Sequence, residues 1–152
     1  MKVIAINREN VHIAGAIHAA AWQASHRDFC AEAFIAAHTP ERQTEYLWAK
    51  MQKGAAVYLL TDGEPVGIVS LTGDLIEDLY ILPEYQNRGY GSFLLGFAMK
   101  RCKVTPTLWI LDNNVGARRL YERYGFRATG QSHRLSDTLS EIEFKRETGE
   151  PS

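Results

Sequence analysis

The sequence predicts an α/β fold built on a mixed, mostly antiparallel sheet of about six to seven strands. Three β-rich runs follow one another with only short turns between them, which indicates an antiparallel meander. The next apolar strand comes after a helical crossover, so it should lie parallel to the strand before it. The chain of 152 residues is long enough for one domain, which we expect over residues 1–146 with a polar tail over 147–152.

The composition argues against several functional classes. Seventeen Lys and Arg residues oppose 18 Asp and Glu residues, and the resulting net charge of −1 offers no basic footprint for nucleic acid. No stretch approaches the ~20 apolar residues of a membrane span, and the start lacks a signal-peptide apolar segment. We therefore expect a cytoplasmic protein without membrane partners. Cys30 and Cys102 form neither a disulfide framework nor a metal-ligand spacing, and we expect no metal.

The first third of the chain is predicted to be one strand followed by three helices. Residues 2–6 are a short β-rich run, and apolar residues recur every three or four positions over 11–25, as in an amphipathic helix. A short helix is expected over 31–37. The next helix, over 40–53, has a Thr-Pro pair at its start and a Gly after its end, which are favoured capping residues.

The predicted meander consists of strands over 55–61, 65–72 and 75–82. The first two are joined at Asp62-Gly63, a strong hairpin signal. Gly67, within the second strand, indicates a bulge or a close contact with a neighbouring group.

The most informative stretch is 79–92, which has the pattern of a buried strand, a sharp turn and the start of an apolar helix over 92–103. Gly89 and Gly91 lie at this junction, where glycine permits a positive φ and the close approach of a ligand. Free N–H groups at a helix start, together with the helix dipole, favour anions such as phosphate. Arg88 adds a cation beside them.

The remaining chain completes the sheet. An apolar strand is predicted over 107–111, and a helix over 115–123 is capped by one of the polar residues before it and ended by a Gly. Two strands over 126–134 and 139–144 form an antiparallel pair. The polar tail after them is expected to fray.

Two blocks of the chain carry a family resemblance. The motif Gln86-x-x-Gly89-x-Gly91, preceded by Leu79-Tyr80-Ile81-x-Pro83-Glu84, resembles the acetyl-CoA-binding motif of the GNAT superfamily of N-acetyltransferases. The segment Asn114–Phe126 is similar to that family's Asn-x-x-Ala-x-x-Leu-Tyr-x-x-x-Gly-Phe block. The blocks occur in the family's order and spacing. The resemblance covers residues 55–146 well and the first 54 only loosely.

The resemblance implies helices on both faces of the sheet and two central parallel strands, 75–82 and 107–112, that splay apart. In the family, the pantetheine arm of acetyl-CoA adds between such strands like an extra strand, while the turn holds the pyrophosphate. It also implies that main-chain groups of Leu79 and Ile81 face the arm and the acetyl carbonyl. The cofactor-binding residues expected on this basis are Leu79, Tyr80, Ile81, Gln86, Asn87, Arg88, Gly89, Tyr90, Gly91, Ser92, Asn114, Ala117 and Tyr121.

Tyr121 matches the family tyrosine that can protonate the departing thiolate. A phenol suits this role because it stays protonated at pH 7, with a reference pKa of ~10. The alternative is a tyrosine packed in the core beside Leu120. Asn114 can cap its helix, contact the cofactor arm, or do both.

The general base is less clearly marked. Leu75 and Trp109 occupy positions where some relatives carry glutamates. The absence of a glutamate at position 109 weighs against N-terminal-alanine acetylation. Glu77, on the same strand face as Leu75, is the candidate base, and a structural carboxylate is the alternative. Asp78 should point to the opposite face and ranks below it. A water chain could replace any single base.

The first helices form part of the acceptor side in the superfamily. Trp22, His26, Asp28 and Tyr46 are therefore candidate acceptor-site residues, although an apolar helix face favours a core position for Trp22. His12, His18 and His26 share no helical face at ligand spacing, which argues against a metal site there.

The function predicted on these grounds is acetyl-CoA-dependent N-acetylation of a primary amine by direct transfer in a ternary complex. The acceptor stays open between a small amine and a peptide or protein amine, and the oligomeric state between monomer and homodimer. One alternative is a non-catalytic acyl-CoA-binding or regulatory module of the same fold, which the residues at 75 and 109 keep open. Another is an interaction domain without cofactor, and the intact Gln86, Gly89 and Gly91 argue against it.

Overall fold

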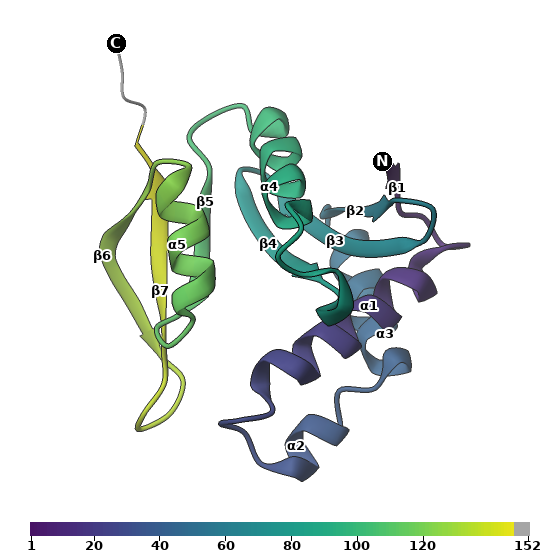
Figure 1. The fold of residues 1–152 in the computed structure, drawn as a ribbon, viewed down its shortest axis with the longest axis horizontal. Helices are drawn as coiled ribbons and strands as arrows, with labels where there is room; N and C mark the ends of the chain where they lie inside the picture. Colours follow the sequence, from purple (N-terminus) through teal and green to yellow (C-terminus); the bar gives the residue numbers. More distant parts are fainter. Residues whose placement is uncertain (148–152) are drawn as a thin grey trace.

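The computed structural model describes residues 1–147 as one seven-stranded sheet with helices on both of its faces (Figure 1). The strands are β1 (Lys2–Ala5), β2 (Ala56–Thr61), β3 (Pro65–Thr72), β4 (Leu75–Ile81), β5 (Thr107–Leu111), β6 (Phe126–Arg134) and β7 (Ser140–Arg146). The helices are α1 (Val11–His26), α2 (Glu32–Ala36), α3 (Pro40–Gln52), α4 (Tyr90–Arg101) and α5 (Val115–Arg123), with a 3₁₀ turn η1 (Pro83–Tyr85).

The strand order is β1-β2-β3-β4-β5-β7-β6, and every neighbouring pair is antiparallel except β4 and β5. This confirms the predicted meander, the parallel crossover through α4 and the closing antiparallel pair. Boundaries shift by one or two residues, because α4 begins at Tyr90 rather than 92 and β7 extends to Arg146. Of the tail predicted over 147–152, all but residue 147 lies outside the described residues.

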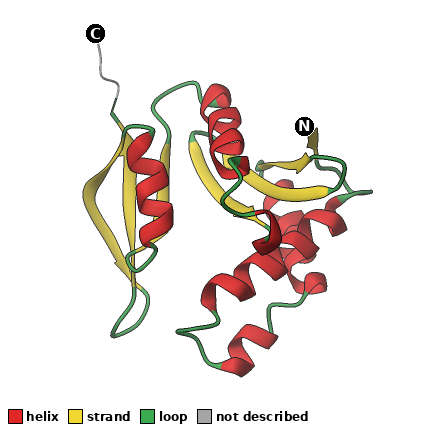
Figure 2. Ribbon diagram, viewed as in Figure 1, coloured by secondary structure: helices red, strands yellow, loops and turns green. Residues whose placement is uncertain are grey.

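Two apolar cores lie on opposite faces of the sheet (Figure 2). One core unites α4 and α5 with the strands through fully buried side chains such as Leu94, Phe126 and Phe144. The other joins α1 and α3 to the first half of the sheet around Leu47 and Ile68. Burial of these apolar faces is the main favourable term in forming the two layers.

Two glycines permit close approaches between elements. A Cβ on Gly15 would lie 2.7 Å from the Thr44 backbone, so glycine lets α1 and α3 cross in contact. A Cβ on Gly67 would lie 2.8 Å from the Tyr80 carbonyl oxygen, which confirms the close contact predicted at this position in β3.

The parallel pair β4 and β5 stays together for only a short distance. Leu75 and Ile76 pair with Thr107 and Leu108, and beyond them no pairing between the two strands occurs in the described residues. Figure 1 shows the two ribbons diverging from this point. The splay that the family resemblance implies is therefore present, and it leaves one edge of β4 without a strand partner.

Candidate functional site

The glycine turn, residues 86–92, presents backbone N–H groups that no protein atom uses. α4 begins at Tyr90, with Gly89 as its N-cap. Within residues 1–147, none of the six N–H groups from Asn87 to Ser92 donates to a protein acceptor. Free amides at a helix start attract anions through hydrogen bonding and the helix dipole. The turn therefore has the donor set for a phosphate group.

The turn uses its glycines differently from what the sequence suggested. Gly89 takes a left-handed φ of +88°, as expected, but the second left-handed residue is Asn87, with φ +63°. Gly91 has no positive φ and lies in the first turn of α4, where a Cβ would be 3.6 Å from the Leu120 side chain. The prediction of a positive φ at Gly91 is wrong, and because a Cβ there would make only an ordinary contact with Leu120, the close approach of a ligand stays a prediction.

Side chains of the turn fix it to the sheet. Gln86 Nε2 donates to the carbonyl oxygen of Ile81 at 3.0 Å, and the Tyr90 hydroxyl donates to Asp62 Oδ2 at 2.6 Å. The Arg88 guanidinium lies over the ring of Tyr85, 5.6 Å from its centroid. Among the described residues no carboxylate lies within 4.0 Å of that guanidinium, so its charge is available to an anion.

The free edge of β4 faces the widening space beside β5. The Leu82 N–H donates to Val66 O in β3 at 2.9 Å. Backbone groups of an antiparallel strand alternate in direction, so the Ile81 N–H points away from β3. This edge is the one that the splay leaves unpaired, and it ends at the glycine turn.

A β-bulge at Asp78 interrupts β4. Ile68 pairs with Tyr80 and Ser70 with Glu77, so β4 carries one extra residue opposite Val69, and Asp78 takes a φ of +50°. The bulge corrects the sequence-based expectation that Asp78 and Glu77 point to opposite faces. Both carboxylates reach the ammonium of Lys50, Asp78 at 2.6 Å and Glu77 at 2.8 Å.

Tyr121 lies in the core between α5 and the sheet, only 8% exposed, with its ring edge against Phe126 at a centroid distance of 5.8 Å. Burial raises the pKa of its phenol above the ordinary value. The hydroxyl makes no hydrogen bond within residues 1–147. Every fully buried polar side-chain atom in those residues has a hydrogen-bond partner, so the Tyr121 oxygen is not fully buried. The result is a protonated phenol with a free oxygen.

Asn114 caps α5 as expected. Its Oδ1 accepts the backbone N–H of Ala117 at 3.0 Å, which satisfies one of the free donors of the first turn. The cap is therefore established by geometry, and a contact of Asn114 with a cofactor stays a prediction.

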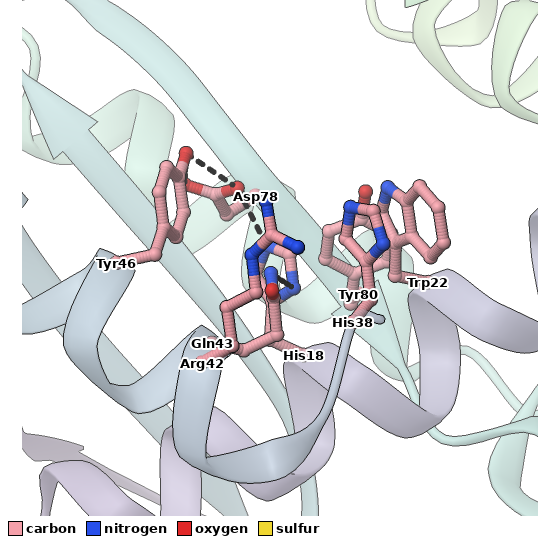
Figure 3. A pocket seen from close by; sticks show the side chains of 8 residues that line it. All are labelled: His18, Trp22, His38, Arg42, Gln43, Tyr46, Asp78 and Tyr80. Carbon is pink, nitrogen blue, oxygen red and sulfur yellow. Dashed lines mark hydrogen bonds and ion pairs between the residues drawn. The ribbon is translucent and has the colours of Figure 1, made fainter. Parts of the chain in front are cut away.

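A second site, the α1–α3 pocket, is a cavity of about 300 Å³ on the other face of the sheet. Figure 3 shows side chains from α1, α3 and β4 around it. Its lining residues are His18, Trp22, His38, Arg42, Gln43, Tyr46, Asp78 and Tyr80. Trp22 and Tyr46, two of the four predicted acceptor-site residues, line this pocket.

The carboxylate of Asp78 is the centre of the pocket's polar network. Oδ1 lies 3.0 Å from His18 Nε2, and Oδ2 accepts bonds from Lys50 Nζ at 2.6 Å and Ser70 Oγ at 2.8 Å. The Tyr46 hydroxyl lies 3.3 Å from both carboxylate oxygens (Figure 3). Every lone-pair direction of this buried carboxylate thus has a donor.

The same network orients His18. Gln43 Nε2 lies 2.9 Å from His18 Nδ1 in the buried floor of the pocket. When Gln43 donates there, His18 accepts at Nδ1 and donates to Asp78 from Nε2, so both ring nitrogens are hydrogen-bonded. The bonds to Gln43 and Asp78 fix the ring plane.

The network shifts several pKa values. Burial alone would raise the pKa of Asp78, but the hydrogen bond from His18 and the charge of Lys50 hold it well below its usual range. Burial alone would lower the pKa of Lys50, and its bonds to Asp78 and Glu77 raise it instead. Burial, followed by the charge of Asp78, raises the pKa of Tyr46 and of Tyr80. Asp78 and Lys50 are therefore a persistent ion pair.

The predicted acceptor-site residues divide into two groups. Trp22 is half-buried and stacks between His26 and His38, at centroid distances of 4.0 and 3.5 Å, so the expected core position is wrong. The end of α1 carries this ring towards the segment between α2 and α3 rather than onto the sheet. His26 supports the stack from outside the pocket, and burial lowers its pKa. Asp28 is exposed and does not line the pocket.

Sequence reasoning missed most of the pocket. His18, Gln43 and Lys50 received no role, because they come from two separate helices and show no shared motif. The only usable signal was polar side chains at otherwise core-facing helical positions, since His18 and Gln43 are both buried. Tyr80, predicted only for the cofactor, also lines the pocket.

Neither a membrane-spanning helix nor a metal-binding cluster occurs in the described residues. Within residues 1–147 no helix is long and apolar enough to cross a membrane. The same residues hold no group of three or more His, Cys, Asp or Glu side chains that could bind a metal ion.

Residues 16–126 match the model of the acetyltransferase (GNAT) family. The chain is 30% identical over 82 residues to an uncharacterized N-acetyltransferase, YafP, of Escherichia coli K12, covering 54% of this chain and 52% of that protein. It is 33% identical over 69 residues to a peptidyl-lysine N-acetyltransferase, YjaB, of Salmonella typhimurium, covering 45% and 47%. The chain thus spans about half the length of the curated relatives that it matches.

Solved structures share the fold over nearly the whole chain. A GCN5-related N-acetyltransferase from Rhodopseudomonas palustris is 25% identical, with a TM-score of 0.72 over 95% of this chain and 94% of the other. The PaiA N-acetyltransferase of Thermoplasma acidophilum, solved in complex with coenzyme A, is 15% identical, with a TM-score of 0.69 over 96% and 99%. At that identity the second likeness supports the fold alone.

Proposed function

The chain belongs to the acetyltransferase (GNAT) family, and we propose that it transfers an acetyl group from acetyl-CoA to a primary amine. The observation that carries this proposal is the set of six unused backbone amides in the glycine turn, at the end of an unpaired strand edge. We further propose that residues 1–146 act as one domain, because both cores share the same sheet.

The residues present fit acetyl-CoA. Amides of residues 87–92 would bind the pyrophosphate, with Arg88 as an added cation, and the free edge of β4 at Leu79 and Ile81 would bind the pantetheine arm. In this arrangement the bound cofactor would lie beside Tyr80, Asn114 and Ala117. The cofactor supplies an activated acetyl thioester, and the transfer moves the acetyl group from sulfur to nitrogen while the amine loses a proton and the thiolate gains one.

Tyr121 is the proposed proton donor to the thiolate. Its raised pKa keeps the phenol protonated, and its hydroxyl has no protein partner among the described residues that would compete for the proton. Tyr121 is on α5, on the cofactor side of the splay between β4 and β5, and Tyr80 of β4 lines the α1–α3 pocket.

Glu77 stays our sequence-based proposal for the base. Its carboxylate accepts bonds from Lys50 at 2.8 Å and Thr72 at 3.2 Å and does not line the α1–α3 pocket. Asp78 does line the pocket, but its lowered pKa makes it a weak proton acceptor. A water at the pocket could carry the proton from the amine to either carboxylate.

The test is amine-dependent release of CoA by wild type and Tyr121→Phe. Removing the phenolic proton should lower kcat about 100-fold, because general acids contribute roughly 10²–10⁴-fold. The rise in Tm caused by acetyl-CoA should persist in this variant. Tyr124→Phe, a half-buried tyrosine at the end of the same helix, is the matched control.

Two outcomes would contradict the proposal. Full activity of Tyr121→Phe with several amines would remove the assigned acid role. Binding of acetyl-CoA without CoA release for any amine would instead indicate a non-catalytic acyl-CoA-binding module.

A further inference from the structure

The α1–α3 pocket has the size of a small-molecule site. Its volume of about 300 Å³ lies at the lower end of the range of roughly 300–1,000 Å³ that is usual for ligand pockets. Its floor is formed by the buried side chains of His18 and Gln43, and aromatic rings of Trp22, Tyr46 and Tyr80 line its walls. A pocket of this volume can hold a small amine.

Among the described residues, Asp78 is the one carboxylate that lines the pocket, and it is already satisfied. Asp78 accepts from His18, Lys50, Ser70 and Tyr46, and the Lys50 ammonium neutralises its charge. The other carboxylate on Lys50, that of Glu77, does not line the cavity. The pocket therefore has no free anion for a cationic ligand group.

Donors without partners surround the same space. Within residues 1–147 the Arg42 guanidinium has no carboxylate within 4.0 Å, and its one bond is a long 3.4 Å contact to the Ala37 carbonyl. The indole N–H of Trp22 and the hydroxyl of Tyr80 make no hydrogen bond in the described residues. Figure 3 shows Arg42 entering from α3 on the side of His18 and Gln43.

We propose that the acceptor is a small primary amine that carries its own carboxylate, that is, an amino-acid-type acceptor, and that Arg42 binds this carboxylate. The inference rests on the proposed function, because it identifies the amine that the transfer would use. A guanidinium presents parallel N–H donors that match a carboxylate in a bidentate pair. With the carboxylate at Arg42 on α3, the amine can lie towards β4, where the main chain of Leu79 and Ile81 is expected to face the acetyl carbonyl.

The test compares matched acceptors that differ only in the carboxylate. The proteinogenic amino acids are assayed beside the corresponding decarboxylated amines and beside a lysine-containing peptide, with kcat/KM measured from CoA release. We expect at least one amino acid to exceed its decarboxylated partner by about 10- to 100-fold, the value of a charge-assisted bond.

Arg42 variants test the assignment of the binding residue. Arg42→Gln should lower kcat/KM for that amino acid by about 10- to 100-fold, mainly through KM, and leave its decarboxylated partner unchanged. Arg42→Lys should recover part of this loss in kcat/KM, because lysine keeps the positive charge but lacks the parallel N–H donors of the guanidinium. Arg134→Gln makes the same charge change in the exposed β6–β7 hairpin and should change neither substrate.

The failures of the two proposals are distinguishable. Equal turnover of both members of each pair, preference for the peptide, or an equal loss on both members in Arg42→Gln would overturn the carboxylate assignment. The absence of turnover with every amino acid, while acetyl-CoA still raises Tm, would also overturn the carboxylate assignment. The proposed cofactor site would be unaffected by that result. If acetyl-CoA itself gives no rise in Tm, the proposed function fails and this inference fails with it.

Discussion

The glycine turn and the α1–α3 pocket lie on opposite sides of β4 and are built from different parts of the chain. The turn uses the backbone N–H groups of six consecutive residues, 87–92, and the side chains there mainly anchor it to the sheet. The pocket uses side chains from α1, α3 and β4, and a network of bonds joins His18, Gln43, Tyr46 and Lys50 to Asp78 directly or through His18. A backbone site is specified locally, whereas a side-chain site depends on the packing of distant segments.

Because the two sites are built differently, we expect substitutions in the turn to affect ligand binding and substitutions in the pocket to affect stability. Substitutions in the turn should remove ligand binding while the fold survives, because its amides make no protein contacts. Substitutions in the Asp78 network should cost stability whether or not a ligand is present, because they leave a buried charge without its partners. The two sites should therefore respond differently to substitution and to pH.

The largest effect is expected for Lys50→Met. It removes the cationic partner of a buried carboxylate, which typically costs about 3–5 kcal/mol of unfolding free energy. Chemical denaturation of this variant beside Lys53→Met, an exposed lysine one turn further along, measures the cost. Lys50→Met/Asp78→Asn should recover part of the loss. If Lys50→Met and Lys53→Met unfold at the same denaturant concentration, the pocket does not depend on the ion pair.

Gly89→Asp should produce the next largest effect, and it should act on binding. A ligand at a hundredfold excess over its Kd stabilises by ~2.7 kcal/mol, and acetyl-CoA should raise the Tm of wild type accordingly. The variant should lose this rise, because its carboxylate faces the proposed phosphate site and its φ of +88° disfavours a side chain.

Gly73→Asp is the matched control for that experiment. Gly73 also has a left-handed φ, of +60°, and open space around its Cα, but it lies in the β3–β4 hairpin. It should keep the full response to acetyl-CoA. If both variants respond like wild type, the glycine turn is not the phosphate site.

The smallest effect concerns pH. The lowered pKa of Asp78 means that its ion pair stabilises the fold above the ordinary aspartate pKa of ~3.9 and loses this contribution as the pH falls below it. Stability should fall there by up to ~1.4 kcal/mol per pH unit for one proton. Lys50, whose pKa is raised, loses its contribution only above its ordinary value of ~10.4.

Asp78→Asn should flatten the fall in Tm between pH 5 and pH 3, whereas Asp28→Asn, at an exposed aspartate, should not. An unchanged slope in Asp78→Asn would contradict the assigned network. The turn lacks a buried carboxylate, so the response to acetyl-CoA should change little over the same range.

The same contrast explains what could be predicted from the sequence. The turn was found because glycine spacing and a strand–helix junction are local signals, and the cap at Thr39 was found for the same reason, since its side chain accepts from the Arg42 N–H. The positive φ expected at Gly91 was wrong, because the second left-handed residue of the turn is Asn87, which no glycine marks.

The pocket could not be predicted in the same way. The bulge at Asp78 adds one residue to β4 without any proline or glycine to mark it, so strict alternation assigned the wrong face. His18 was weighed only against other histidines for metal binding, although its partners are Gln43 and Asp78, 25 and 60 residues away. Trp22 was named as an acceptor-site candidate, and a core position was favoured over that role because its helix face is apolar, but α1 extends beyond the sheet at that end.

The divergence of β4 and β5 has a consequence for self-association. An unpaired strand edge is a template on which another chain can add a strand, and sheets normally cover or shorten such edges. Here the edge is internal and opens as a wedge, with β5 pairing only at Leu75 and Ile76. A strand from a second copy that entered this wedge could not pair with both β4 and β5, because the two strands separate beyond Ile76. We therefore expect the wedge to hinder strand addition by a second copy more than it hinders a slender ligand.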